Sequence, residues 1–103
     1  TIALIGDGQA VVALCCNEKL FEKTMNNIVE VKARGAKVIA IAKTGNKKIN
    51  ELADDVLFVP ETFETFTAIA EIIPLQLLAY YVAKLRNCDI DKPKNLAKSV
   101  TVE

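Results

Sequence analysis

Three short apolar runs, separated by helix-forming and turn-forming segments, constrain the fold of this chain most. They are AVVALCC at residues 10–16, KVIAIA at residues 37–42 and VLFV at residues 56–59. Uninterrupted runs of this kind are typical of strands that are buried on both faces of a parallel sheet. Parallel neighbours are joined by right-handed crossovers, usually through a helix. The sequence therefore predicts a Rossmann-like α/β fold in three αβα layers, whose incomplete parallel sheet has about three strands with helices on its faces.

The segment between the first two runs has the marks of an amphipathic helix. Asn17 can cap its start, and apolar residues recur every three or four positions from Leu20 to Val31. Gly35 can take the left-handed conformation that often ends a helix. A shorter helix is expected over residues 47–53, after a turn that contains glycine.

A long apolar helix is predicted over residues 66–87. Pro74 lies inside it and lacks the amide hydrogen of a helical residue, so we expect a kink or a restart there. Beyond Pro74 the segment is apolar nearly all round, and one sheet cannot cover every side of it. A second partner, either another domain or another subunit, should cover the far side, and one edge of the thin sheet should lack its neighbour.

The charge balance argues against some classes of partner. The 103 residues include 13 basic and 13 acidic residues that alternate along the chain, so no basic patch favours nucleic acid or an anionic membrane. The longest apolar stretch, residues 72–82, is interrupted by Pro74 and Gln76 and is short for a bilayer span. The sequence does not open on a signal pattern. We therefore expect one compact domain, without a membrane partner, in the cytoplasm.

The cysteines predict buried structural thiols rather than a metal site. Cys15, Cys16 and Cys88 form no CxxC pair, and the sequence has no histidine to complete a zinc site. Free cysteine is among the most buried residue types. Cys15 and Cys16 should point to opposite faces of their strand, which argues against a bridge between them.

Two other candidate sites are weaker. The glycines of GDG at residues 6–8 precede a strand, whereas a dinucleotide fingerprint follows one, so nucleotide binding is not expected. Glu61, Glu64 and Glu71 could be imagined as an acid and base set. Their spread over a loop and a helix favours a solvated face instead.

The chain ends in a separate tail, residues 89–103 (DIDKPKNLAKSVTVE), with no periodicity long enough to bury itself. A tail of this kind often serves a neighbouring site. Its KPKNLAKSVTVE resembles the terminal signature of the glucosamine-6-phosphate synthase family, the isomerising glutamine:fructose-6-phosphate aminotransferases. Upstream, NEKLFEKTMNNIVEVKARG and IPLQLLAYYVAKLRNCDID resemble two helical regions of the same family. The resemblance covers essentially the whole chain.

The resemblance implies one piece of a two-part enzyme. In this family a glutaminase domain releases ammonia, and a pair of sugar isomerase (SIS) domains combines it with fructose 6-phosphate to form glucosamine 6-phosphate. Residues 1–88 resemble the second half of the second SIS domain, and residues 89–103 resemble its active-site tail. The expected partners are the sugar phosphates, the rest of the same enzyme and a second subunit in a homodimer. No cofactor or metal is expected.

Three tail residues receive roles from the resemblance. The lysine of the family's NLAKS motif takes part in ring opening and forms a Schiff base with the ketose carbonyl, which points to Lys98 as the catalytic residue. Ala97 would lie against the sugar, and Leu96 would lie near the route of ammonia. Lys94 stands where many relatives have arginine, which keeps the charge. The family's phosphate-binding loops, acidic base and ring-opening histidine lie outside this sequence, so the chain alone should be inactive.

Two other functions stay open at this point. SIS domains also serve as sugar-phosphate sensors in regulators, where the fold binds a ligand without a reactive lysine. An assembly module would associate with its partner through the apolar helix after Pro74.

Overall fold

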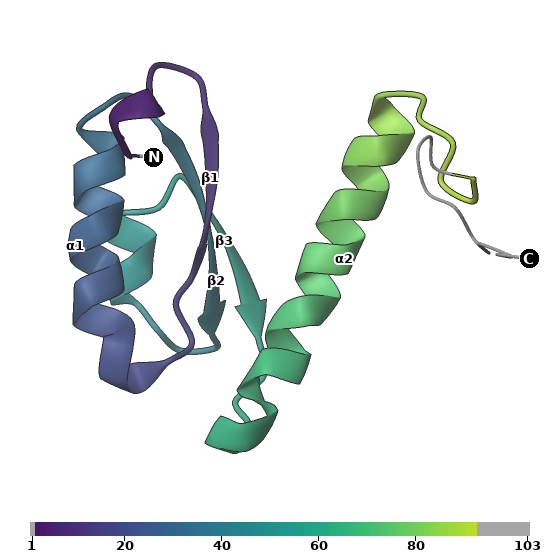
Figure 1. Cartoon of the computed structure of the whole chain (residues 1–103). Coiled ribbons are helices and arrows are strands. Elements are labelled where there is room, and N and C mark those ends of the chain that lie inside the picture. The colour runs from purple at the N-terminus through teal and green to yellow at the C-terminus, as the bar shows by residue number, and fades with distance from the viewer. Residues whose placement is uncertain (1, 93–103) are drawn as a thin grey trace, which may run out of the picture.

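A computed structural model describes residues 2–92. Three strands and two α-helices form the body of the fold (Figure 1). They are β1 (Ala10–Leu14), α1 (Phe21–Lys32), β2 (Lys37–Lys43), β3 (Asp55–Val59) and α2 (Thr67–Leu85). Short 3₁₀ turns lie at η1 (Ile2–Leu4), η2 (Glu18–Leu20), η3 (Lys48–Glu51) and η4 (Glu64–Phe66).

The strands form one parallel sheet in the order β1-β2-β3. β2 lies in the centre, and Ala40 pairs in register with Ala13 on one side and Val56 on the other. The central strand is accordingly the most buried, because both of its neighbours and both of its faces are covered. The predicted three-stranded parallel sheet is confirmed.

The main core lies between the sheet and one helical layer. α1 turns an apolar stripe toward the sheet, and η3 adds Ile49 beside it. The buried residues of this layer are Cys15, Met25, Ile28, Val31, Ala36, Val38, Ala40, Ala42 and Ile49. The half-buried Phe21 and the buried Met25, Ile28 and Val31 recur at intervals of four and three along α1, as the sequence predicts.

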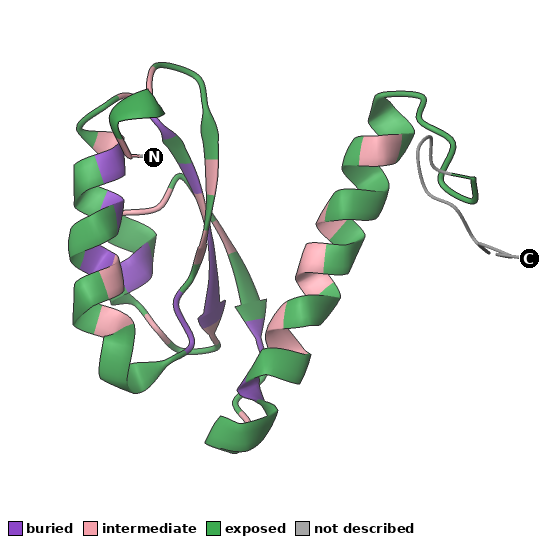
Figure 2. Ribbon diagram, viewed as in Figure 1, coloured by how far each residue is buried: buried purple, intermediate pink, exposed green. Residues whose placement is uncertain are grey.

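α2 packs against part of the opposite face and forms the third layer. A smaller core cluster joins Cys16, Ile41 and Val59, and Ala70 and Leu75 of α2 pack against it. The first half of α2 therefore contacts the sheet, whereas the second half leans away from it (Figure 1). Much of α2 is exposed (Figure 2).

Some local expectations need correction. The segment expected to be a helix over residues 47–53 forms only the short 3₁₀ turn η3. No restart occurs at Pro74, because α2 is assigned as one helix from Thr67 to Leu85. The length argument against a membrane span also fails: the helical segment Glu64–Leu85 is long and apolar enough to cross a bilayer, by length and composition alone.

Gly35 ends α1 in the way the sequence predicts. Its φ is 88°, and the amides of Gly35 and Ala36 donate to the carbonyls of Lys32 and Val31, at 2.9 and 3.2 Å. This is the paired hydrogen-bond pattern of a Schellman motif, which satisfies the last carbonyls of the helix. A Cβ atom at Gly35 would also collide with the Asp7 carboxylate and lie 3.1 Å from the Asp7 Cα.

We expect Gly35→Ala to destabilise the chain by more than Gly45→Ala. Both glycines have positive φ, but a Cβ at Gly45 meets nothing within 4 Å. The left-handed backbone costs each alanine about 1–2 kcal/mol, and only Gly35→Ala adds the clash with Asp7. Urea unfolding of the two variants measures the difference; equal losses would show that the contact with Asp7 is easily relieved.

Candidate functional site

A polar pocket of about 310 Å³ lies at the carboxyl ends of the strands. Parallel α/β sheets place their ligand sites at this edge, because the loops that follow the strands meet there. The pocket is bounded by the segments after β1 and β3, the last residue of β2 and the first turns of α2. Its lining residues are Cys16, Asn17, Glu18, Lys19, Lys43, Glu61, Thr62, Glu64, Thr67, Ala68 and Glu71.

An ion pair joins two walls of the polar pocket. Lys43 ends β2, and its Nζ lies 2.8 Å from Oε1 of Glu18 in η2. The hydrogen bond to Glu18 raises the pKa of Lys43, and the same bond lowers the pKa of Glu18. Lys43 therefore stays an ammonium group and does not offer the neutral amine that Schiff-base chemistry needs.

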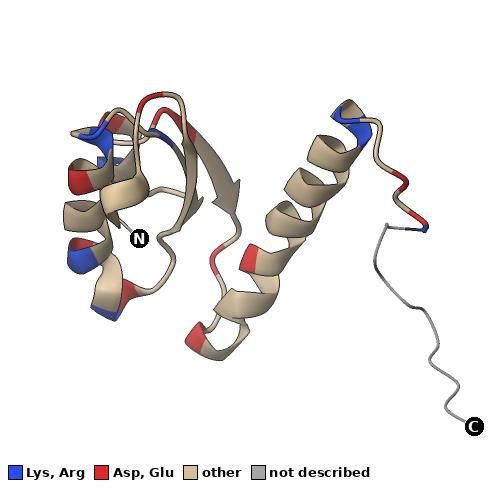
Figure 3. Ribbon diagram, turned by 45° about the horizontal axis from the view of Figure 1, so that its top comes forward, with Lys and Arg blue, Asp and Glu red and all other residues tan. Residues whose placement is uncertain are grey.

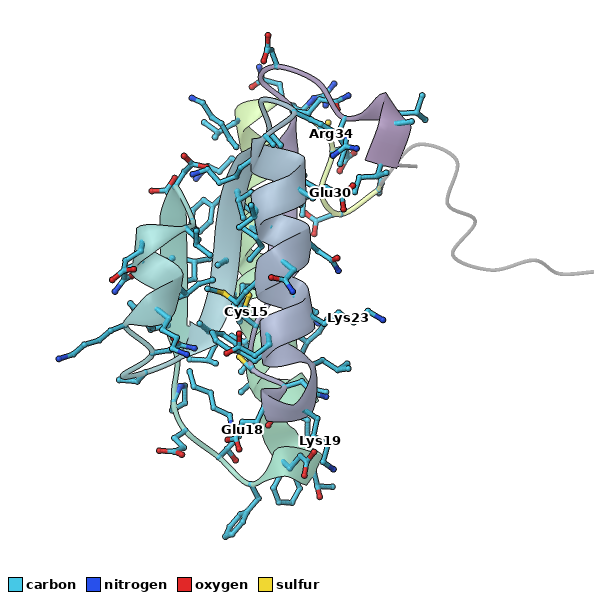
Figure 4. The ribbon with its side chains drawn as sticks, turned by 90° about the vertical axis from the view of Figure 1, so that its left-hand side faces the viewer. Cys15, Glu18, Lys19, Lys23, Glu30 and Arg34 are labelled. Carbon is cyan, nitrogen blue, oxygen red and sulfur yellow. The ribbon has the colours of Figure 1, made fainter. Side chains whose placement is uncertain are left out.

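The charge of the polar pocket disfavours a phosphate group. Four carboxylates line it, from Glu18, Glu61, Glu64 and Glu71, against the two ammonium groups of Lys19 and Lys43. Lys19 and Lys43 are each already paired with a carboxylate, at 3.3 and 2.8 Å. Figure 4 shows Glu18 and Lys19 close together at the start of α1. A sugar phosphate would meet net negative charge here.

The two adjacent cysteines are buried and point to opposite layers. Cys15 packs with α1 and Cys16 packs with the cluster under α2, as expected from their alternation. Burial, and then the Glu71 carboxylate, raise the pKa of Cys15 to about 11 and that of Cys16 to about 12. Cys88 is exposed beyond the end of α2, so its predicted burial is wrong. A long helix carries it past the sheet, where nothing among residues 2–92 covers it.

We expect iodoacetamide at pH 8 to alkylate Cys88 alone in the folded chain. A thiol with a pKa of about 11 is ionised in roughly one molecule in a thousand at this pH, and burial blocks the reagent as well. Intact-mass spectrometry should give one adduct in buffer and three in urea. Rapid native labelling of Cys15 or Cys16 would contradict the packing of β1.

A metal ion has no evident site in the described part of the chain. No three acidic, histidine or cysteine side chains among residues 2–92 converge in a way that would hold one. Two carboxylates of the polar pocket instead pair with ammonium groups, Glu64 with Lys19 and Glu18 with Lys43.

The fold matches a solved structure, and the sequence matches a family profile. The C-terminal domain of glucosamine-fructose-6-phosphate aminotransferase from Francisella tularensis superposes with a TM-score of 0.76 and 34% identity, over 89% of this chain and 26% of that one. The profile of the SIS domain matches residues 1–86. The chain belongs to the SIS domain family.

Relatives of this SIS domain share one name. Glutamine–fructose-6-phosphate aminotransferase [isomerizing] from Thermus thermophilus is 54% identical over 102 residues, which is 99% of this chain. The protein of the same name from Caldanaerobacter subterraneus subsp. tengcongensis is 50% identical over 103 residues, or 100% of this chain. In both cases the chain spans only 17% of the relative's length. The chain is therefore homologous to the C-terminal sugar-isomerising part of these enzymes.

The predicted catalytic tail of this SIS domain is only partly described. Lys98, Ala97 and Leu96 lie outside the described residues. The tail begins in a turn where the Asp89 carboxylate accepts hydrogen bonds from the amides of Asp91 and Lys92, at 3.0 and 2.8 Å. This turn follows the end of α2 that is farther from the polar pocket (Figure 1). A helix of this length spans about 28 Å.

The polar pocket is the feature that sequence reasoning missed. The sequence predicts a solvated face for Glu61, Glu64 and Glu71, and Glu61 and Glu64 are exposed. The fold nonetheless brings all three around one cavity with Lys43. Position in the sequence was the only available signal, because the residues of the pocket lie just after a predicted strand or near the start of a predicted helix.

Proposed function

We propose that this chain is the C-terminal part of a glucosamine-6-phosphate synthase, which makes glucosamine 6-phosphate and glutamate from fructose 6-phosphate and glutamine. The observation that carries the proposal is identity of 50–54%, along essentially the whole chain and its tail, to glutamine–fructose-6-phosphate aminotransferases [isomerizing]. Residues 1–88 would complete an SIS domain, and residues 89–103 would form its active-site tail.

In this proposal Lys98 is the catalytic residue. Its amine would attack the ketose carbonyl of fructose 6-phosphate and form a Schiff base after ring opening. Ala97 would line the sugar, and Leu96 would border the path of ammonia. The described Lys43 is a poor candidate for the same role, because its ion pair with Glu18 raises its pKa.

The proposal requires other parts of the enzyme to complete the active site. The polar pocket carries net negative charge, so the phosphate of the sugar would be held elsewhere, by the preceding SIS domain. Ammonia would come from a glutaminase domain. The complete enzyme would act as a homodimer in the cytoplasm.

A reconstitution assay tests this function. The chain is mixed with the separately produced upstream portion of the same enzyme, and glucosamine 6-phosphate is measured with glutamine and fructose 6-phosphate as substrates. We expect neither piece to be active alone and the mixture to be active. An inactive mixture of two pieces that demonstrably associate would favour a sugar-phosphate sensor or an assembly module.

A further inference from the structure

The chain leaves α2 through a defined helix end. α2 has its C-cap at Arg86, and the next residue, Asn87, has a φ of 53°, the one positive φ outside glycine among residues 2–92. Asparagine tolerates this left-handed conformation better than most residues do. The amide of Asn87 donates to the carbonyl of Lys84 at 3.1 Å, and the amide of Cys88 donates to the carbonyl of Ala83 at 2.9 Å. These paired bonds form a Schellman motif, so the chain turns away from α2 at a fixed residue.

The Asp89 carboxylate builds a second turn directly after this helix end. One oxygen, Oδ1, accepts hydrogen bonds from the amides of Asp91 and Lys92, at 3.0 and 2.8 Å. An aspartate side chain that accepts from backbone amides two and three residues further on forms an Asx turn. Lys92 also precedes Pro93 in the sequence, and the residue before a proline is biased away from helical conformations. Two turns of different kinds therefore follow each other between residues 86 and 92.

Packing does not hold this segment in place. Residues 84–92 are all exposed, so burial of their own side chains does not fix the path of the backbone. Electrostatics also disfavour carboxylates here, because the end of a helix carries partial negative charge. Figure 3 shows basic residues in the last turn of α2 and acidic residues just beyond it. Hydrogen bonds to a charged acceptor are the stronger kind, and the two bonds to Asp89 are the described interactions that order residues 89–92.

The direction of this turn matters for the reach of the tail. Lys98 lies nine positions after Asp89 in the sequence. A fully extended chain of nine residues spans at most about 32 Å, which is close to the length of α2 itself. A tail that left α2 in the wrong direction would use part of this reach to bend back. The turn at residues 89–92 therefore limits which part of the enzyme Lys98 can approach.

We propose that Asp89 is a positioning residue for the reaction of Lys98, because its carboxylate fixes the turn from which the tail leaves α2. This rests on the proposed function, in which the amine of Lys98 attacks the ketose carbonyl. Asp89 acts by reducing the number of directions that the tail can take. Less conformational entropy is then lost when the amine is brought to the carbonyl. The carboxylate serves as a hydrogen-bond acceptor, and its charge is not required.

Three substitutions separate this role from a general effect of charge. Asp89→Ala removes the acceptor of both hydrogen bonds. Asp89→Asn removes the charge and keeps a side-chain oxygen that can accept them. Asp91→Ala is the matched control, because Asp91 is also exposed and contributes its backbone amide, rather than its carboxylate, to the turn. Alkylation of Cys88 alone, with Cys15 and Cys16 protected, verifies that each variant has folded.

The effect of each substitution is measured on the mixture of this chain with the upstream portion of the enzyme. Asp89→Ala should lower kcat for glucosamine 6-phosphate synthesis by about tenfold, the effect of losing two hydrogen bonds of ordinary net strength. Its KM for fructose 6-phosphate should change by less than about twofold, because the proposal places the phosphate in the preceding SIS domain. The yield of a borohydride-trapped adduct on Lys98 should fall with kcat. Asp89→Asn and Asp91→Ala should keep kcat within about twofold of the parent value.

Amide hydrogen exchange tests the turn without any synthesis. The amides of Asp91 and Lys92 should exchange more slowly in the parent chain and in Asp89→Asn than in Asp89→Ala, and equal exchange in all three would overturn the inference. So would, with an active parent, an unchanged kcat in Asp89→Ala, a loss that appears only in KM, or an equal loss in Asp89→Asn. A parent mixture that associates and makes no glucosamine 6-phosphate refutes the proposed function instead, and the role of Asp89 falls with it.

Discussion

Lys98→Ala should lower glucosamine 6-phosphate synthesis by the reassembled enzyme by about 10³-fold or more, the scale expected when a covalent nucleophile is removed. In the proposed mechanism Lys98 bonds to the ketose carbonyl, and Lys43 of the polar pocket is a poor substitute because its ion pair with Glu18 raises its pKa. The measurement is initial rate at saturating fructose 6-phosphate and glutamine.

Lys92→Ala is the matched control for the loss of a tail lysine. Lys92 is exposed at the start of the tail, and its backbone amide, rather than its side chain, makes the described hydrogen bond to Asp89. Its removal should leave the rate within about twofold, because exposed charges contribute little. Glutamine hydrolysis should survive Lys98→Ala, since the glutaminase chemistry is separate. Synthesis that persists in Lys98→Ala would remove this residue from the reaction.

Ile28→Ala should destabilise the chain by about 2–5 kcal/mol. Ile28 is only 2% exposed and lies in the centre of the core between α1 and the sheet. Deleting its side chain leaves a cavity that neighbouring helix and strands can close only in part. Because a domain of this size is stable by about 5–15 kcal/mol, the loss is a large share of the total.

Val29→Ala provides a control at the next position. Val29 is on the same helix and 51% exposed, so its truncation should change stability by no more than about 0.5 kcal/mol. Both substitutions introduce alanine, which makes their gain in helix propensity comparable. Urea unfolding followed by circular dichroism measures both. Similar small effects at the two positions would mean that α1 does not pack on the sheet as described.

Local sequence patterns predicted most of the fold, because each of these structural features depends on residues that are close together in the sequence. Uninterrupted apolar runs marked the three strands, and the adjacent Cys15 and Cys16 pack on opposite faces as alternation requires. Gly35 ends α1 in a left-handed conformation. These features depend on backbone sterics and on the two periods of helix and strand.

Features set by distant contacts were harder to foresee. Cys88 is exposed because α2 leads away from the sheet. The residue type of Cys88 alone does not predict the direction in which α2 runs. Lys43 and Glu18 meet across 25 positions of sequence, so their ion pair follows only from the register of the strands. The proposed role of Lys98 rests on resemblance alone, since an isolated lysine in a sequence is usually a solvated charge.

The most direct measurement is trapping with borohydride. The reassembled enzyme is incubated with fructose 6-phosphate, reduced, digested and analysed by mass spectrometry for a hexose phosphate attached to a lysine. The account predicts one adduct, on Lys98, which is absent from the Lys98→Ala variant. An active enzyme that gives no adduct on Lys98, or one on another lysine of this chain, would contradict it.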